Sequence, residues 1–164
     1  MRVAVISDTH LPRGQRRLPD LCVEELRRAD LILHAGDVAT AEVLAEIEAI
    51  GPPVRAVRGN VDRDDLAHLP EALSVDIDGV TVAMLHDAGP AKGRLDRLRA
   101  RFPDADAVVF GHSHIPLHEE RDGFHIFNPG SPTDRRRQPR HTMGVAEVSR
   151  GTVAFRHLVV DPRP

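Results

Sequence analysis

The sequence contains no tryptophan and no tyrosine, and aromatic residues make up only 3% of its 164 residues. Proteins that bind single-stranded nucleic acid stack the bases on aromatic side chains, which are scarce here. The formal net charge of −3 also provides no overall positive field that would attract a polyanion. We therefore expect no large nucleic acid as a partner, whereas a small nucleotide stays open as a substrate.

Cysteine and long apolar runs are scarce as well. The only cysteine, Cys22, has no partner for an internal disulfide, which is typical of a reducing compartment. No apolar run approaches the roughly 20 residues of a membrane-spanning helix, and the first residues lead into a strand pattern rather than a signal peptide. We expect a cytoplasmic protein with no membrane contact, folded as a single domain over residues 1–164.

Short β-rich runs alternate with helical periods in the first half of the chain. The predicted strands cover residues 3–7, 31–35 and 54–58, and the predicted helices cover residues 19–28 and 40–50. This βαβαβ order predicts parallel strands joined by right-handed crossovers.

Antiparallel pairing begins in the second half. Strands predicted at residues 73–77 and 80–85 flank Asp78-Gly79, which is a strong signal for a two-residue hairpin. A helix over residues 93–102 and a strand over residues 107–110 follow, and then two further hairpins around Asp122-Gly123 and Arg150-Gly151. The pattern predicts an α/β (mixed α+β) fold with two sheets packed face to face and helices outside. Edge strands of the late hairpins make a homodimer an option.

Polar residues follow five of the predicted strands directly. The five signatures are Asp8-Thr9-His10, Gly36-Asp37, Gly59-Asn60, His86-Asp87 and Gly111-His112-Ser113-His114. Because they come at strand ends, we expect them to converge on one edge. Residues i and i+2 of a strand point to the same side, so each of the pairs Asp8/His10 and His112/His114 could reach one ion.

These residues offer carboxylate, imidazole and amide ligands, and no thiolate. Such a set suits Mn²⁺, Zn²⁺, Fe or Ni²⁺ better than Mg²⁺, and it does not choose among the four. A single His-x-His pair is weak evidence in a chain with 10 histidines. The ordered series of five signatures, each after an apolar run, is far more specific.

From residue 3 to about residue 131 the chain resembles the calcineurin-like metallophosphoesterase superfamily, in particular its short bacterial and archaeal phosphodiesterase branch. The resemblance implies a four-layer αββα sandwich and two divalent ions, with Asp37 as the ligand that both share. One ion would be held by Asp8, His10, Asp37 and His114. The other would be held by Asp37, Asn60, His86 and His112.

The resemblance also implies an activity. We expect a dinuclear metal-dependent phosphoesterase, foremost a phosphodiesterase, that acts on a small phosphate ester through in-line attack by a metal-bridging hydroxide. Asp37, Asn60 and His86 are the expected catalytic residues. Mn²⁺ is the first choice of metal, with Zn, Fe or Ni as alternatives. Ligation requires neutral imidazoles, so metal affinity should fall in mild acid.

The chain departs from the family pattern at two places. Many members carry a histidine after Gly-Asn, where this chain has Val61 and then Asp62. The missing imidazole predicts weak catalysis for poor leaving groups, since general acid help is commonly worth roughly 10²–10⁴-fold. The phosphodiesterase branch that the chain resembles also lacks this histidine, which favours diesters or activated esters over ordinary monoesters. The second departure is Asp87-Ala88 after His86, where close relatives often have Gly-His.

Three residues are candidates for contact with substrate: Arg13, Arg58, which could instead pair with Asp62, and Asn128 of the Asn-Pro-Gly-Ser loop. Arg16 and Arg17 also follow the first signature closely. The arginine run 135–137 with Arg140 fits either a cationic rim for phosphate or a solvated loop.

Two other functions are compatible with parts of the sequence. A sandwich-fold binding or scaffold module with weak or no turnover would keep the fold, but such modules usually lose several ligands. A serine hydrolase using Ser113 or Ser131 lacks the G-x-S-x-G elbow. His34 precedes a signature inside a strand and is expected to be structural.

Overall fold

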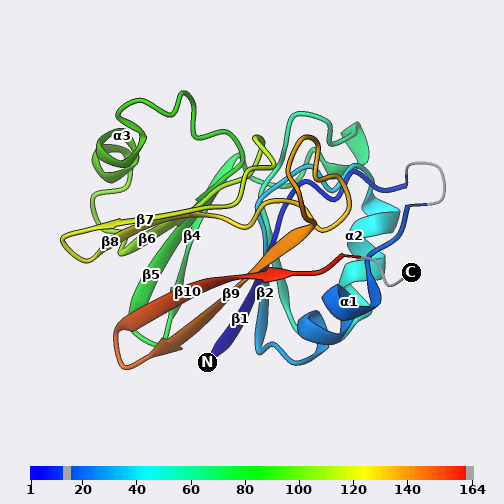
Figure 1. Cartoon of the computed structure of the whole chain (residues 1–164), viewed down its shortest axis with the longest axis horizontal. Coiled ribbons are helices and arrows are strands. Elements are labelled where there is room, and N and C mark those ends of the chain that lie inside the picture. Colours follow the sequence, from blue (N-terminus) through cyan, green and yellow to red (C-terminus); the bar gives the residue numbers. More distant parts are fainter. Residues whose placement is uncertain (13–15, 162–164) are drawn as a thin grey trace.

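A computed structural model of the chain describes residues 1–12 and 16–161. Two five-stranded sheets pack face to face in it (Figure 1). The first sheet contains, in spatial order, β10 (Thr152–Val159), β9 (Thr142–Ser149), β1 (Arg2–Ile6), β2 (Leu31–His34) and β3 (Val54–Ala56). The second contains β4 (Ala72–Ile77), β5 (Val80–Leu85), β6 (Ala107–Val109), β8 (Phe124–Asn128) and β7 (Leu117–Arg121).

Helices cover the outer face of each sheet. Helices α1 (Asp20–Arg27) and α2 (Ala41–Glu48) pack on the first sheet, and α3 (Arg94–Arg101) packs on the second (Figure 1). A single turn of 3₁₀ helix covers Asp64–Leu66. The four-layer αββα sandwich is confirmed. None of the helices in the described part of the chain is long and apolar enough to cross a membrane.

Both sheets are mixed. Strands β1, β2 and β3 pair in parallel, as the βαβαβ order predicts, and β9 joins β1 in the antiparallel direction. In the second sheet β6 is parallel to both β5 and β8. The three predicted hairpins are confirmed, and each has a left-handed residue followed by glycine at its turn, the geometry of a type I′ turn.

Three apolar clusters hold the layers together. The cluster between the two sheets includes Val5, Leu33 and Phe127. A second cluster joins the first sheet to α1 and α2 and contains Ile32 and Cys22. Cys22 is therefore part of the core, and its burial raises the pKa of the thiol to about 12. The third lies under α3.

Four strands end one or two residues earlier than the sequence predicted. Strands β1, β2, β3 and β6 end at Ile6, His34, Ala56 and Val109. The apolar pattern continues past these points, but the chain leaves the ladder there to form the loops that carry the polar signatures. The carboxyl ends of the parallel strands therefore open into one set of loops.

The packing of Ile32 under α1 and α2 generates a stability prediction. Ile32 is fully buried, whereas the side chain of Ile115 lies on the surface with 47% exposure. Ile32→Ala should lower the free energy of unfolding by about 2–5 kcal/mol, because it leaves a cavity in the core. Ile115→Ala is the matched control and should change it by less than about 0.5 kcal/mol. Urea unfolding measures both, and equal effects would contradict this assignment of the core.

Candidate metal centre

The structure brings the side chains of all seven predicted ligands together at one edge of the sandwich. They come from the loops after β1, β2 and β3 of the first sheet and after β5 and β6 of the second. These residues are Asp8, His10, Asp37, Asn60, His86, His112 and His114. Neither sheet supplies the site alone, so the face-to-face packing is what assembles it.

The first group combines Asp8 and His10 of one sheet with His114 of the other. His114 Nε2 lies 3.3 Å from Asp8 Oδ1, and His10 Nε2 lies 3.8 Å from the same oxygen. The two Nε2 atoms are 3.2 Å apart. All three side chains are buried, and they form one of the groups in which every donor lies within 4.8 Å of the others.

The second group surrounds the Asn60 side chain. Asn60 Oδ1 lies 3.0 Å from His86 Nε2 and 3.0 Å from His112 Nδ1. The Asn60 oxygen comes from the first sheet and both imidazoles come from the second. An amide oxygen between two imidazole nitrogens is a donor set that fits a divalent transition metal.

Asp37 lies between the two groups. Its Oδ2 atom is 3.3 Å from His10 Nε2 and 3.3 Å from His86 Nε2. Asp8, Asp37 and His86 form another cluster of buried donors within 4.8 Å of each other. The buried oxygen and nitrogen donors, gathered without a thiolate, therefore fit metal ions, and Asp37 lies where a shared ligand would.

The local backbone differs from what the sequence argument assumed. Asp8 and His10 follow β1 rather than belonging to it, and they adopt left-handed conformations with φ of 56° and 48°. His112 and His114 are left-handed too, and they lie in different groups rather than in one. The strand conformation assumed for both pairs was therefore wrong. Asp8 and His10 nevertheless lie in one group, as predicted, whereas the shared site predicted for His112 and His114 was wrong. Asp37 also has a positive φ of 58°, so sparsely populated backbone conformations cluster at the site.

Hydrogen bonds outside the groups orient the ligands. The Nδ1 atoms of His86 and His114 point at the carbonyls of Ala35, at 2.8 Å, and of Asp134, which leaves each Nε2 facing the site. The Ser7 hydroxyl donates to Asp8 Oδ2 at 2.7 Å. Such partners fix ring orientation and raise ligand basicity.

Asp62 has a supporting role that the sequence analysis missed. Its two oxygens accept the backbone N–H of Ala39 at 2.7 Å and of Gly59 at 2.6 Å, so it ties the Asp37 loop to the Asn60 loop. Aspartate side chains can accept from a backbone group three residues earlier, and this spacing of Gly59 and Asp62 is visible in the sequence. The expected pairing of Asp62 with Arg58 is wrong, because Arg58 Nη2 faces Asp64 at 3.9 Å.

Asn128 supports the site from beneath. Its side chain is fully buried, and its Nδ2 donates to the Gly111 carbonyl at 2.8 Å and to Ser113 Oγ at 3.2 Å. This amide is used to hold the loop of His112 and His114, so the structure does not place it in contact with substrate. Arg13 lies outside the described residues.

Ser131 does not have the surroundings of a nucleophile. It is buried, and its hydroxyl donates to the Asp8 carbonyl at 2.8 Å. The structural role expected for His34 is supported, since it is fully buried and its Nε2 lies 3.2 Å from Thr9 Oγ1. Burial, opposed by nearby carboxylates, lowers the pKa of His34 to about 4 and keeps it neutral.

An ion pair joins Asp37 to His86. Burial alone would lower the pKa of His86, but the hydrogen bond and charge of Asp37 outweigh it and raise this pKa to about 9. Burial would raise the pKa of Asp37, and His86 reverses that effect and lowers it. For His114 burial prevails and lowers the pKa. His86 therefore carries a proton at neutral pH, and a metal ion would have to displace this proton to bind the imidazole nitrogen.

A cleft of about 420 Å³ opens beside the second group. Asn60 and His86 lie in its wall together with Arg58 and Asp87. Asp87 Oδ1 accepts the Gly89 N–H at 2.7 Å. Arg58 therefore lines the same cleft as Asn60 and His86. Its contact with substrate stays a prediction.

Comparison with known proteins places these features in a family. The calcineurin-like phosphoesterase superfamily domain matches residues 1–151. A probable metallophosphoesterase of Methanothermobacter thermautotrophicus is 35% identical over 81% of this chain and 78% of its own length. A protein of Methanocaldococcus jannaschii named as a phosphodiesterase is 26% identical over 79% of this chain and 83% of its own length.

A solved structure agrees with the fold. Wild-type Vps29 from Entamoeba histolytica, described as a complex with Zn²⁺, superposes with a TM-score of 0.78. It covers 98% of this chain and 100% of its own, with 21% identity.

The close approach of Gly59 to Asp37 generates a prediction about metal binding. A Cβ atom on Gly59 would clash with the Asp37 carboxylate, whereas one on Gly123 would meet open space. Gly59→Ala should therefore weaken metal binding by about 10–100-fold, the usual effect of disturbing a ligand's support. Calorimetric titration with Mn²⁺ measures the affinity. Gly123→Ala, in a distant hairpin, should leave it unchanged, and equal affinities for all three proteins would contradict the account.

The raised pKa of His86 predicts how metal affinity depends on pH. Below about pH 9 this imidazole carries a proton, which must leave before the nitrogen can bind a cation. Affinity should rise with pH by up to about tenfold per unit and level off above about pH 9. Titrations at about pH 8 in buffers of different ionisation enthalpy would count the released proton. His125→Gln, outside the site, should not change the count, and binding without proton release would contradict the prediction.

Proposed function

The chain belongs to the calcineurin-like phosphoesterase superfamily, and on that premise we propose that it is a phosphodiesterase with a two-ion metal centre. The family and its named relatives indicate a metal-dependent phosphoesterase. The step from phosphoesterase to phosphodiesterase rests on the residues of this chain, and the relative named as a phosphodiesterase supports it.

The position of Asp37 is the observation that carries the proposal. Its Oδ2 is equally far, at 3.3 Å, from an imidazole of each ligand group. Two ions held by these groups, once bound, would acidify a shared water for in-line attack on phosphorus and neutralise the phosphoryl oxygens. Asp37 fixes the spacing of the groups, while Asn60 and His86 complete the group that borders the open cleft.

The absence of a general acid decides the kind of ester. Val61 stands where many relatives have a histidine, and its side chain is 39% exposed beside Asn60. Its backbone N–H donates to Asp37 Oδ1 at 3.0 Å, so this residue positions the carboxylate instead of moving a proton. Leaving groups that need no protonation, such as aryl alcohols, are therefore favoured. The relative named as a phosphodiesterase supports diesters over monoesters.

We propose a small phosphate ester, including a nucleotide, as the substrate class. The cleft of about 420 Å³ has the size of a small-molecule site. Arg58 and Arg101 supply cations in its wall, and the carboxylates of Asp62, Glu71 and Asp87 lie there too, so bound metal ions would have to add the positive charge that attracts a phosphate. Mn²⁺ is the proposed metal. The nitrogen-rich donor set also suits Zn²⁺, and the Vps29 structure described as a Zn²⁺ complex supports this alternative.

A scaffold module without turnover is the second candidate. The similarity of this chain's fold to Vps29 favours this candidate, because a related structure is named vacuolar protein sorting 29, a name that refers to sorting and not to hydrolysis. Against it stands the complete set of seven converging side chains, each with an oxygen or nitrogen donor aimed into the site.

Metal removal and Asp37 test the proposal together. Protein stripped of metal should not hydrolyse bis(p-nitrophenyl) phosphate, and added Mn²⁺ should restore the release of nitrophenol. Asp37→Asn should lower this rate by more than about 100-fold, because it removes the ligand shared by both groups. Asp104→Asn, on the exposed surface, is the matched control and should leave the rate unchanged.

Two outcomes would contradict the proposal. In the first, the folded protein binds Mn²⁺, Zn²⁺, Fe²⁺ and Ni²⁺, but none of these ions restores hydrolysis. This result would favour the scaffold module. In the second, Asp37→Asn keeps full activity, which would show that Asp37 is not a ligand that both ions need.

A further inference from the structure

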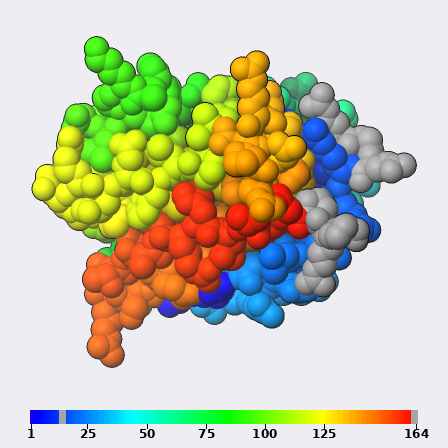
Figure 2. Space-filling model, in the orientation of Figure 1, coloured from blue at the N-terminus to red at the C-terminus, as the bar shows by residue number. Residues whose placement is uncertain are grey.

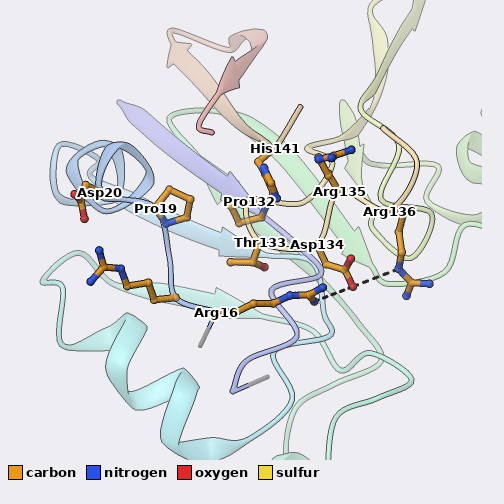
Figure 3. Close-up of a pocket in the computed structure, with 10 residues that line it drawn as sticks. Arg16, Pro19, Asp20, Pro132, Thr133, Asp134, Arg135, Arg136 and His141 are labelled. Carbon is orange, nitrogen blue, oxygen red and sulfur yellow. Dashed lines mark ion pairs between the residues drawn. The ribbon is translucent and has the colours of Figure 1, made fainter. Parts of the chain in front are cut away.

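A second and larger cleft lies next to the metal centre. It has a volume of about 560 Å³ and runs between residues 16–20 and the loop of residues 132–141. Figure 2 shows these segments side by side on the surface, the first in blue and the second in orange. Figure 3 shows the side chains that line the cleft.

The lining of this cleft is strongly basic. Four arginines and two aspartates contribute to it, which leaves a net charge of +2 with His141 neutral, in a chain whose net charge is −3. The arginines are Arg16, Arg17, Arg135 and Arg136. A local excess of positive charge in a concave site attracts anions from solution.

The guanidinium groups are held in place by their neighbours. Arg16 Nη1 lies 3.2 Å and Arg136 Nε lies 3.4 Å from the same Asp134 oxygen, and Figure 3 shows them approaching from opposite sides. Arg135 Nη1 donates to the Gln138 carbonyl at 2.5 Å. Each guanidinium has five N–H donors, so these contacts orient the groups and leave donors for a ligand.

The wall of the cleft is also the support of the metal centre. The Asp134 carbonyl accepts from His114 Nδ1, and the Thr133 hydroxyl donates to the Thr9 carbonyl at 2.5 Å. Residues 131–134 therefore border the arginines on one side and the ligands Asp8 and His114 on the other.

We propose that this cleft binds a second phosphate group of the substrate, so that the preferred substrate is a phosphodiester that carries an additional phosphate. Arginine forks match the oxygens of phosphate and of carboxylate in pairs, and the local excess of positive charge favours the more highly charged phosphate. The walls contain prolines and no aromatic ring other than His141, so the cleft recognises the charge of the ligand and does not stack a base. The inference rests on the proposed function, because it concerns the substrate of that site.

The test uses two diesters that differ only in the additional phosphate. They are the p-nitrophenyl ester of thymidine 5′-phosphate and the same ester with a 3′-phosphate. Mn²⁺-loaded wild-type protein should have the higher kcat/KM for the second ester. Arg136→Gln should lower this preference by about tenfold, because a charge-assisted hydrogen bond to phosphate is lost. The preference, as a ratio, cancels any effect of Arg136 on the metal centre.

Arg137→Gln is the matched control. Arg137 belongs to the same arginine run and is exposed, but it does not line the cleft. It should leave the preference unchanged. An equal loss in both variants would mean that only the general charge of the loop matters and would overturn the proposal.

A binding measurement separates this inference from the proposed activity. Calorimetry should give wild-type protein a higher affinity for thymidine 3′,5′-bisphosphate than for thymidine 5′-phosphate, and Arg136→Gln should reduce that difference. Binding with this pattern but without hydrolysis would uphold the cleft and defeat the phosphodiesterase. Hydrolysis of both esters at equal kcat/KM would uphold the phosphodiesterase and overturn the proposed phosphate site in the cleft. The same conclusion would follow if inorganic phosphate accelerated hydrolysis of the ester without the 3′-phosphate while the protein showed no preference between the two esters.

Discussion

The Asp37 carboxylate joins the two halves of the site, because one of its oxygens lies 3.3 Å from an imidazole that follows β1 and 3.3 Å from one that follows β5. These strands belong to different sheets. Each ligand group therefore closes only when the sheets pack on each other, through the apolar cluster that contains Val5, Leu33 and Phe127. Core packing far from the chemistry therefore determines whether the donors can meet around shared ions.

Buried like charges and strained backbone oppose this arrangement, and specific contacts offset them. Asp8, His10 and Asp37 all have positive φ, which costs of order 1 kcal/mol or more each for residues other than glycine. Asp62 compensates in part by accepting backbone N–H groups from two loops, and glycine at position 59 allows the Asp37 carboxylate to lie against the neighbouring backbone. Strain held by surrounding hydrogen bonds is typical of preorganised sites, in which the protein side chains are oriented before the metal ion binds.

Much of the fold, and the convergence of the seven polar side chains at one edge, could be predicted because they depend on local signals. That these side chains bind metal stays a prediction. Alternating apolar runs, Asp-Gly turns and polar residues at strand ends are visible in the sequence, and parallel strands bring such ends together. The left-handed turns at Asp8 and His10 could not be predicted, since positive φ is uncommon even for aspartate and histidine, the residues enriched in it. The support by Asp62 and Asn128 depends on contacts between distant loops. The basic cleft likewise exists only because residues 16–20 and 132–141 meet in space.

The number and position of bound ions test the central claim most directly. Anomalous diffraction from crystals soaked in Mn²⁺ should show two peaks about 3.5–4 Å apart on either side of the Asp37 carboxylate. One peak should lie among Asp8, His10 and His114, and the other among Asn60, His86 and His112. A single peak, or two peaks that do not share Asp37, would contradict the account.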